Sequence, residues 1–78
     1  MTEHARQARY SMVIQWSDED QAYLVTLPDW ASAVLQPVTH GDSYAEAAQN
    51  GQEVLDMLVE EAQRKGQPLP PVQALQPA

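Results

Sequence analysis

The sequence predicts an α+β fold, a three-stranded antiparallel sheet in the order β-β-β-α with one long helix on one face. Two observations predict the sheet: apolar residues alternate along 10–16 and again along 22–27, and a weaker β-prone segment follows at 33–39. A third observation predicts the helix, because apolar residues recur at the helical period from Ser43 onward for about 22 residues, or about 33 Å.

The first two strands should pair as an antiparallel hairpin. One side of the first strand carries Tyr10, Met12, Ile14 and Trp16, and one side of the second carries Tyr23, Val25 and Leu27. The polar residues between the two strands form the connection. Pro28 ends the second strand, because proline has no backbone N–H to donate to the sheet.

The third strand is predicted at 33–39, after a connection at 29–32. It contains Pro37, which restricts it to an edge of the sheet or marks a bulge. Gly41 and Asp42 then break the strand before the helix.

Signals for both ends of the helix are present. Ser43 is predicted as the N-cap, with Glu46 three residues later to complete a capping box. Asp42 adds negative charge at the positive end of the helix dipole. Gly66, which follows two basic residues and precedes Pro68, is predicted as the C′ residue that ends the helix.

The helix should dock through one apolar face. This face comprises Tyr44, Ala47, Ala48, Gly51, Val54, Leu55, Leu58, Val59 and Ala62. An unneeded glycine inside a helix costs about 1 kcal/mol relative to alanine. We therefore expect Gly51, near the middle of the face, to mark a close approach to the sheet.

Size and composition indicate one small domain that associates with other chains. We assign a disordered N-terminal segment to 1–9, the folded domain to 10–66 and a proline-rich tail to 67–78. The 78 residues include no cysteine and no cluster of metal ligands. Disulfides and structural metal ions, which commonly stabilise very small folds, are therefore not expected. Both faces of the strands carry apolar side chains, and a homodimer or tetramer would cover the second face.

The charge pattern excludes some partners. The net charge is −7, and no Lys or Arg occurs between Tyr10 and Gln63, whereas every acid except Glu3 lies in that interval. Such a surface repels phosphates, so direct nucleic-acid binding is not expected, whereas a basic protein would be attracted. No apolar run approaches 18 residues, and we expect a cytoplasmic protein that does not enter membranes.

We predict no catalytic, metal-binding or cofactor-binding residues. The first strand contains no acid, although metal-dependent nucleases need clustered carboxylates to hold metal ions. The acidic turn 18–20 lacks the ligand order of a calcium loop. His40 lies beside Asp42, but the chain has no cysteine, and Ser43 is already used as a cap. The sequence therefore favours a binding protein over an enzyme.

Six residues are candidates for a partner or oligomer interface. These are Trp16, Asp18, Glu19, Asp20, Trp30 and Met57. Tryptophan is common both at interfaces and in small cores, and the sequence leaves both readings open for Trp16 and Trp30. The three acids suit a basic partner, and Met57 lies outside the apolar face of the helix.

Several segments together carry a family resemblance. They are Tyr-Ser-Met-Val-Ile at 10–14, the acidic turn at 18–20, Tyr23-Leu24-Val25, Leu27-Pro28-Asp29, Gly41-Asp42-Ser43, Glu46-Ala47 and Gly66-Gln67-Pro68-Leu69-Pro70-Pro71. In order and spacing this pattern resembles the HicB antitoxin family. The resemblance implies a partial RNase H-like fold without nuclease activity, which binds and masks a small basic RNA-cleaving toxin of the HicA type.

The sequence also departs from that family. Many members carry a C-terminal DNA-binding domain, whereas this sequence ends in the proline-rich tail, so repressor activity is not expected. The segment 28–41 is longer than in the short versions of the family. Compact members can lack a toxin, and the alternative function is therefore a solitary oligomeric scaffold or interaction protein.

Overall fold

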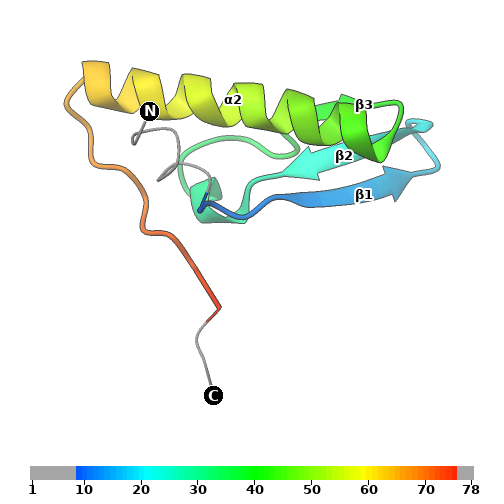
Figure 1. Cartoon of the computed structure of the whole chain (residues 1–78), viewed down its shortest axis with the longest axis horizontal. Helices are drawn as coiled ribbons and strands as arrows, with labels where there is room; N and C mark the ends of the chain where they lie inside the picture. Colours follow the sequence, from blue (N-terminus) through cyan, green and yellow to red (C-terminus); the bar gives the residue numbers. More distant parts are fainter. Residues whose placement is uncertain (1–8, 76–78) are drawn as a thin grey trace.

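The chain forms an α+β fold, as predicted. A computed structural model describes residues 9–75; the predictions for 1–8 and 76–78 lie outside this range. The elements are β1 (Val13–Ser17), β2 (Ala22–Thr26), the 3-10 helix η1 (Pro28–Trp30), β3 (Thr39–Gly41) and α2 (Tyr44–Arg64). The sheet is antiparallel in the order β1-β2-β3, and α2 lies across one face of it (Figure 1).

The predicted hairpin is confirmed, with Ile14 opposite Val25 and Trp16 opposite Tyr23. β1 begins later than predicted, at Val13. Upstream of it, the N–H of Ser11 donates to the carboxylate of Asp29 over 2.7 Å. β2 ends before Pro28, which begins η1.

The predicted third strand was wrong in position. β3 comprises only Thr39–Gly41, and 33–38 is a connection. Pro37 has no N–H for a ladder, and the Gln36 side chain takes the place of a strand residue. Its Oε1 accepts from the N–H of Leu27 at 3.1 Å, and its Nε2 donates to the carbonyl of Leu27 at 3.0 Å. The buried backbone of Leu27 is thus paired by a side chain.

The capping prediction for α2 is confirmed, with one change. The Ser43 hydroxyl accepts from the N–H of Glu46 at 3.1 Å. The Glu46 carboxylate reaches back to the N–H of Asp42, one residue before the N-cap, whereas a standard capping box uses the N-cap N–H itself. Both bonds satisfy donors at the start of the helix.

The C-terminal stop signal is also confirmed. Gly66 has a φ of +70°, which favours glycine. Its N–H donates to Gln63 and that of Gln67 donates to Ala62, at 3.2 and 2.8 Å. These two bonds define a Schellman motif, which reverses the chain into the tail.

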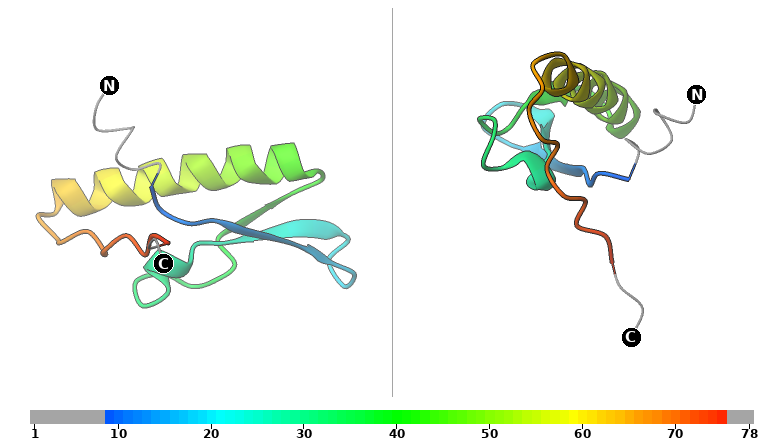
Figure 2. Two further views of the ribbon diagram at one scale, coloured as in Figure 1. Left: turned by 60° about the horizontal axis from the view of Figure 1, so that its bottom comes forward. Right: turned by 90° about the vertical axis from the view of Figure 1, so that its left-hand side faces the viewer.

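The core lies between α2 and the sheet (Figure 2). Its fully buried side chains are Val25, Leu27, Leu55 and Val59. The close approach predicted at Gly51 is confirmed, since an added Cβ would lie 2.8 Å from Sδ of Met12 and 3.0 Å from Cγ1 of Val25. Gly41 is tighter still, because its added Cβ would lie 2.4 Å from the backbone nitrogen of Ala47. Two glycines therefore set how closely the layers pack.

The tail runs back from α2 past η1 (Figure 2). The Tyr10 hydroxyl donates to the carbonyl of Pro70 at 2.6 Å, and the N–H of Gln73 donates to Asp29 at 2.9 Å. The described part of the tail, through residue 75, forms no helix or strand. It is held by two side chains of the folded domain.

Candidate protein interface

Three aromatic rings form a row at the end of the molecule where the β1-β2 hairpin meets the start of α2. Trp16 lies edge-on to Tyr23 with ring centroids 5.1 Å apart, and Tyr23 lies 4.3 Å from Tyr44 in a tilted arrangement. Trp16 and Tyr44 remain 48% and 63% exposed. The row therefore presents large aromatic surfaces that are already held in place, which is a property of interaction hot spots.

Carboxylates lie in the segments next to this aromatic row, and one of them contacts it directly. Asp18 accepts from the Trp16 indole N–H at 2.7 Å, which fixes the ring and the charge together. Asp20 is held in the turn by the Ser17 hydroxyl at 2.9 Å. Exposed acids also occupy the turn and the start of α2. We define the hairpin end as the aromatic row together with Asp18, Glu19, Asp20, Asp42 and Glu46.

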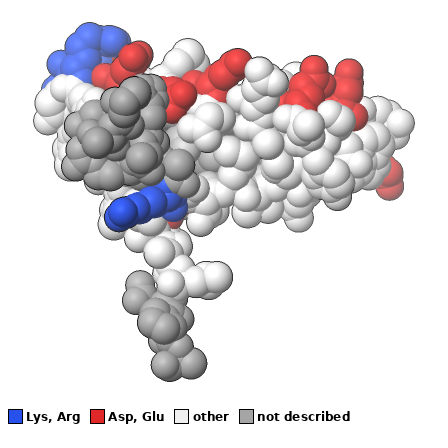
Figure 3. Space-filling model, viewed as in Figure 1, with Lys and Arg blue, Asp and Glu red and all other residues white. Residues whose placement is uncertain are grey.

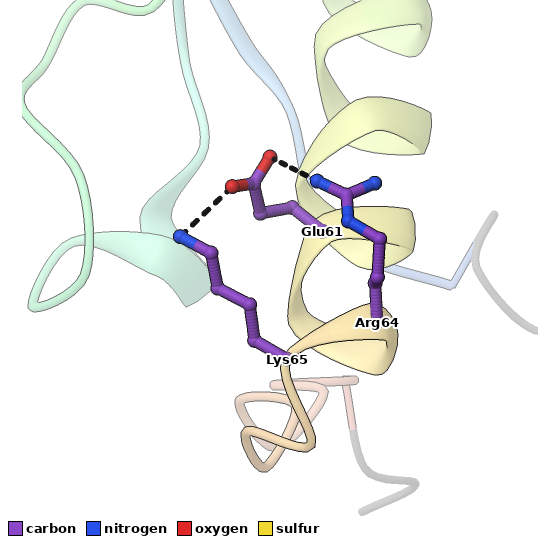
Figure 4. A network of polar contacts seen from close by, with 3 residues as sticks. All are labelled: Glu61, Arg64 and Lys65. Carbon is purple, nitrogen blue, oxygen red and sulfur yellow. Dashed lines mark ion pairs between the residues drawn. The ribbon is translucent and has the colours of Figure 1, made fainter.

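The cations at the other end of α2 are already paired. Arg64 and Lys65 both bind the Glu61 carboxylate, at 3.3 and 2.9 Å (Figure 4). The hydrogen bond from Lys65, with the charges of Lys65 and Arg64, lowers the pKa of Glu61. All three side chains are exposed, so this network contributes little to stability, and the one carboxylate offsets one of the two positive charges.

The remaining charge is unevenly distributed over the surface. Figure 3 shows Asp and Glu along the solvent side of α2 and a broad uncharged surface between α2 and β1. The acids of α2 on that outer side include Glu46, Glu53 and Glu60, which are all exposed. A basic protein would therefore be attracted to the hairpin end and to the back of α2.

The structure separates the six predicted interface residues. Trp16 and the three acids of the turn lie together at the hairpin end. Met57 is 62% exposed but lies 13 residues beyond Tyr44, about 20 Å along α2. The prediction of Trp30 as an interface residue was wrong. Trp30 is 4% exposed, and its ring packs edge-on against Tyr10 with ring centroids 5.6 Å apart, so it belongs to the core.

Four residues of the hairpin end were not among the six predicted interface residues: Tyr23, Asp42, Glu46 and Tyr44, of which Tyr44 is the most exposed aromatic ring. Its helical phase placed it on the docked face of α2, but it is the first helical residue and is 63% exposed. It contacts Tyr23 on one side and solvent on the other. Its position next to the N-cap is the signal that would have identified it.

A second polar feature, centred on Asp29, ties three segments together. The Asp29 side chain is buried and accepts the N–H of Ser11 and the N–H of Gln73. Burial, and secondly the charge of Asp29, raise the pKa of the Tyr10 phenol. An open cleft of about 610 Å³ lies between η1 and the tail, lined largely by proline and alanine. We interpret Asp29 as a structural clamp.

The sheet face opposite α2 is mixed, not continuously apolar. Val13 is 40% exposed and Leu24 is half-buried, but Gln15, Thr26 and His40 lie among them. A hollow of about 340 Å³ on this face is lined by Asp20, Ala22, Leu24, Pro37 and His40. The connection before β3 thus covers part of this face.

The described residues do not form a metal centre. Within 9–75, no three His, Cys, Asp or Glu side chains are grouped to hold a metal ion. His40 and Asp42 are both exposed, and in this range no hydrogen bond joins their side chains. The carbonyl of His40 instead accepts from Asn50 at 2.7 Å. No helix in the described part of the chain has the length and apolar composition to cross a membrane.

Comparisons of the chain with protein-family models, with curated proteins and with solved structures gave no match.

Proposed function

We propose that this chain is a HicB-like antitoxin domain, which binds and neutralises a small basic HicA-type mRNA-cleaving toxin through protein contact. The observation that carries the proposal is the hairpin end, where a fixed row of exposed aromatic rings lies among carboxylates. The order and spacing of the sequence segments, which resemble the HicB family, indicate that the partner is a small basic toxin.

The chemistry of the hairpin end suits arginine and lysine side chains. A guanidinium group stacks on an aromatic face and pairs with a carboxylate at the same time. Because Trp16 and Tyr44 already contact Tyr23, a partner would pay little conformational entropy to order them. The surrounding acids would accelerate encounter with a basic protein.

The proposed action is masking, without catalysis by this chain. A protein of 78 residues that covers the RNA-binding surface of a similarly small toxin would block it sterically. Antitoxin and toxin would meet in the cytoplasm, where the mRNA substrate is found.

Co-expression with any small basic protein that is encoded beside this chain tests the proposal. The parent chain should capture that protein and restore growth. Charge reversal at the hairpin end, Glu19→Lys with Asp42→Lys, should weaken capture about tenfold or more. Neither side chain makes a hydrogen bond within 9–75, and thermal unfolding should confirm that the variant is folded.

A matched control makes the same change of charge elsewhere. Glu53→Lys with Glu60→Lys alters the outer side of α2 and should leave capture within about threefold, since long-range attraction alone is modest. If the two double variants bind equally, the hairpin end is not the binding surface. If the parent chain neither captures the neighbour nor rescues growth, the antitoxin function is rejected.

The alternative is a solitary oligomeric scaffold without a toxin. The uncharged edge strand β1, in a domain too small to bury a large core, favours self-association. A gene neighbourhood without any small basic reading frame would favour this alternative.

A further inference from the structure

The two edges of the sheet differ in whether their backbone groups are occupied. The N–H of Val38 donates to the carbonyl of Val25 at 2.9 Å, so the backbone of Val25 points toward β3. In an antiparallel ladder this direction alternates from residue to residue. Ile14 lies opposite Val25 and Trp16 opposite Tyr23. The N–H and C=O groups of Ile14 and Trp16 therefore point outward, away from β2.

The outer edge of β3 is already occupied. His40 lies opposite Leu24, and by the same alternation its carbonyl points away from the sheet. That carbonyl accepts from the side chain of Asn50 in α2 at 2.7 Å. β3 is also only three residues long. Strand addition at this edge is blocked by the protein's own helix.

Within residues 9–75, the edge of β1 carries none of the sequence features that usually protect an edge strand. Its five residues, Val-Ile-Gln-Trp-Ser, include no charge, no proline and no glycine, although the chain carries a net charge of −7. The surface between β1 and α2 is uncharged as well (Figure 3). In an acidic chain, an uncharged strand is the place where two copies approach with least repulsion.

We propose that two copies of this chain pair antiparallel through their β1 edges, with Gln15 on the two-fold axis. The outward groups of Ile14 would then exchange hydrogen bonds with those of the partner's Trp16, giving about four bonds by symmetry. The product is one continuous six-stranded sheet with both helices on the same face.

Two further features fit this register. Ile14 is half-buried and Trp16 is 48% exposed. In the dimer, Ile14 of one copy would lie beside Trp16 of the other copy, on the side of the sheet that faces the helices. Arg9, which is exposed, lies six residues before Gln15, and the acidic turn lies three to five residues after it. The antiparallel arrangement therefore brings Arg9 toward the acidic turn of the partner.

The proposal deepens the self-association that the alternative function assumes. Trp16 belongs both to the hairpin end and to the β1 edge, but pairing and toxin capture can be tested separately. Gln15 is exposed on the face opposite α2, away from the aromatic row. Changes at Gln15 thus test pairing without altering the hairpin end, and the Glu19 and Asp42 variants test toxin capture without altering β1.

The test uses charge at the symmetry axis, measured by sedimentation velocity on the full chain. The parent should be a dimer. Gln15→Glu and Gln15→Lys should each weaken dimerisation at least tenfold, because like charges would face each other. An equimolar mixture of the two variants should form a heterodimer. Gln49→Lys, on the solvent side of α2, is the control and should dimerise like the parent.

A second measurement uses the absence of cysteine from the chain. Gln15→Cys should oxidise to a disulfide-linked dimer, since directly opposed residues in a non-hydrogen-bonded antiparallel pair have Cα atoms about 4.5 Å apart, which a disulfide can span. Gln49→Cys should remain unlinked under the same conditions. A monomeric parent, a dimer insensitive to both charges at Gln15, or a mixture that does not associate would each overturn the proposal.

Discussion

Replacing Gly41 with alanine should be among the most damaging small changes in this protein. The added Cβ would lie 2.4 Å from the backbone nitrogen of Ala47, 2.7 Å from its Cα and 2.9 Å from the carbonyl carbon of Glu46. Ordinary contact begins at 3.4 Å, so β3 and the first turn of α2 must separate by about 3.4 minus 2.4, or 1.0 Å. All three atoms are backbone, and no side chain can move aside.

The expected cost is about 3 kcal/mol, at the upper end of typical overpacking. For a domain of this size, that corresponds to a fall in Tm of about 12–24 °C. Thermal unfolding followed by far-UV circular dichroism measures it. Gly66→Ala is the control: nothing lies within 4 Å of its Cβ position, and only the φ of +70° is unfavourable. That change should cost about 1–2 kcal/mol. A Tm for Gly41→Ala at or above that of Gly66→Ala would refute the close packing of β3 on α2.

Three further changes probe other contacts. Ser43→Ala should lower the free energy of unfolding by about 1 kcal/mol in urea denaturation, because the N-cap bond is lost; an unchanged midpoint would contradict the cap. Gln36→Ala should cost about 2 kcal/mol and speed hydrogen exchange at the Leu27 amide, whose partner is removed; unaltered exchange would count against the pairing. The pKa of Tyr10 is raised above its ordinary 10.0, by burial first and by Asp29 second, so the folded state holds the phenol proton more tightly. The free energy of unfolding should therefore be steady below pH 10 and fall as the pH rises beyond it, and Tyr10→Phe should flatten this fall. Equal pH profiles for the two proteins would refute that role.

The sequence was most informative where structure depends on near neighbours. The helix cap at Ser43 and the stop at Gly66 each depend on a few consecutive residues, and both were predicted in place. The close approach at Gly51 also followed from its position in the helical repeat. The first two strands alternate clearly, which fixed their pairing.

Errors arose where distant residues decide the outcome. The third strand was predicted too early because nothing local indicates that the Gln36 side chain pairs with Leu27, nine residues away. Trp30 is buried by its contact with Tyr10, from the segment before β1. The hairpin end combines residues from both hairpin strands and α2, so only its acidic turn and Trp16 could be anticipated.

The bond from Asn50 to the carbonyl of His40 has a consequence for how large an assembly can become. A sheet with two free edges can add copies without limit and grow into a fibre, whereas in the part of the chain that the structure describes the β3 edge is occupied and the β1 edge is open. Pairing through β1, as proposed, would leave no free edge among these residues. Because the helix occupies the β3 edge, each copy would offer one edge for pairing. This would protect β1, a strand rich in β-forming residues, from amyloid-like polymerisation.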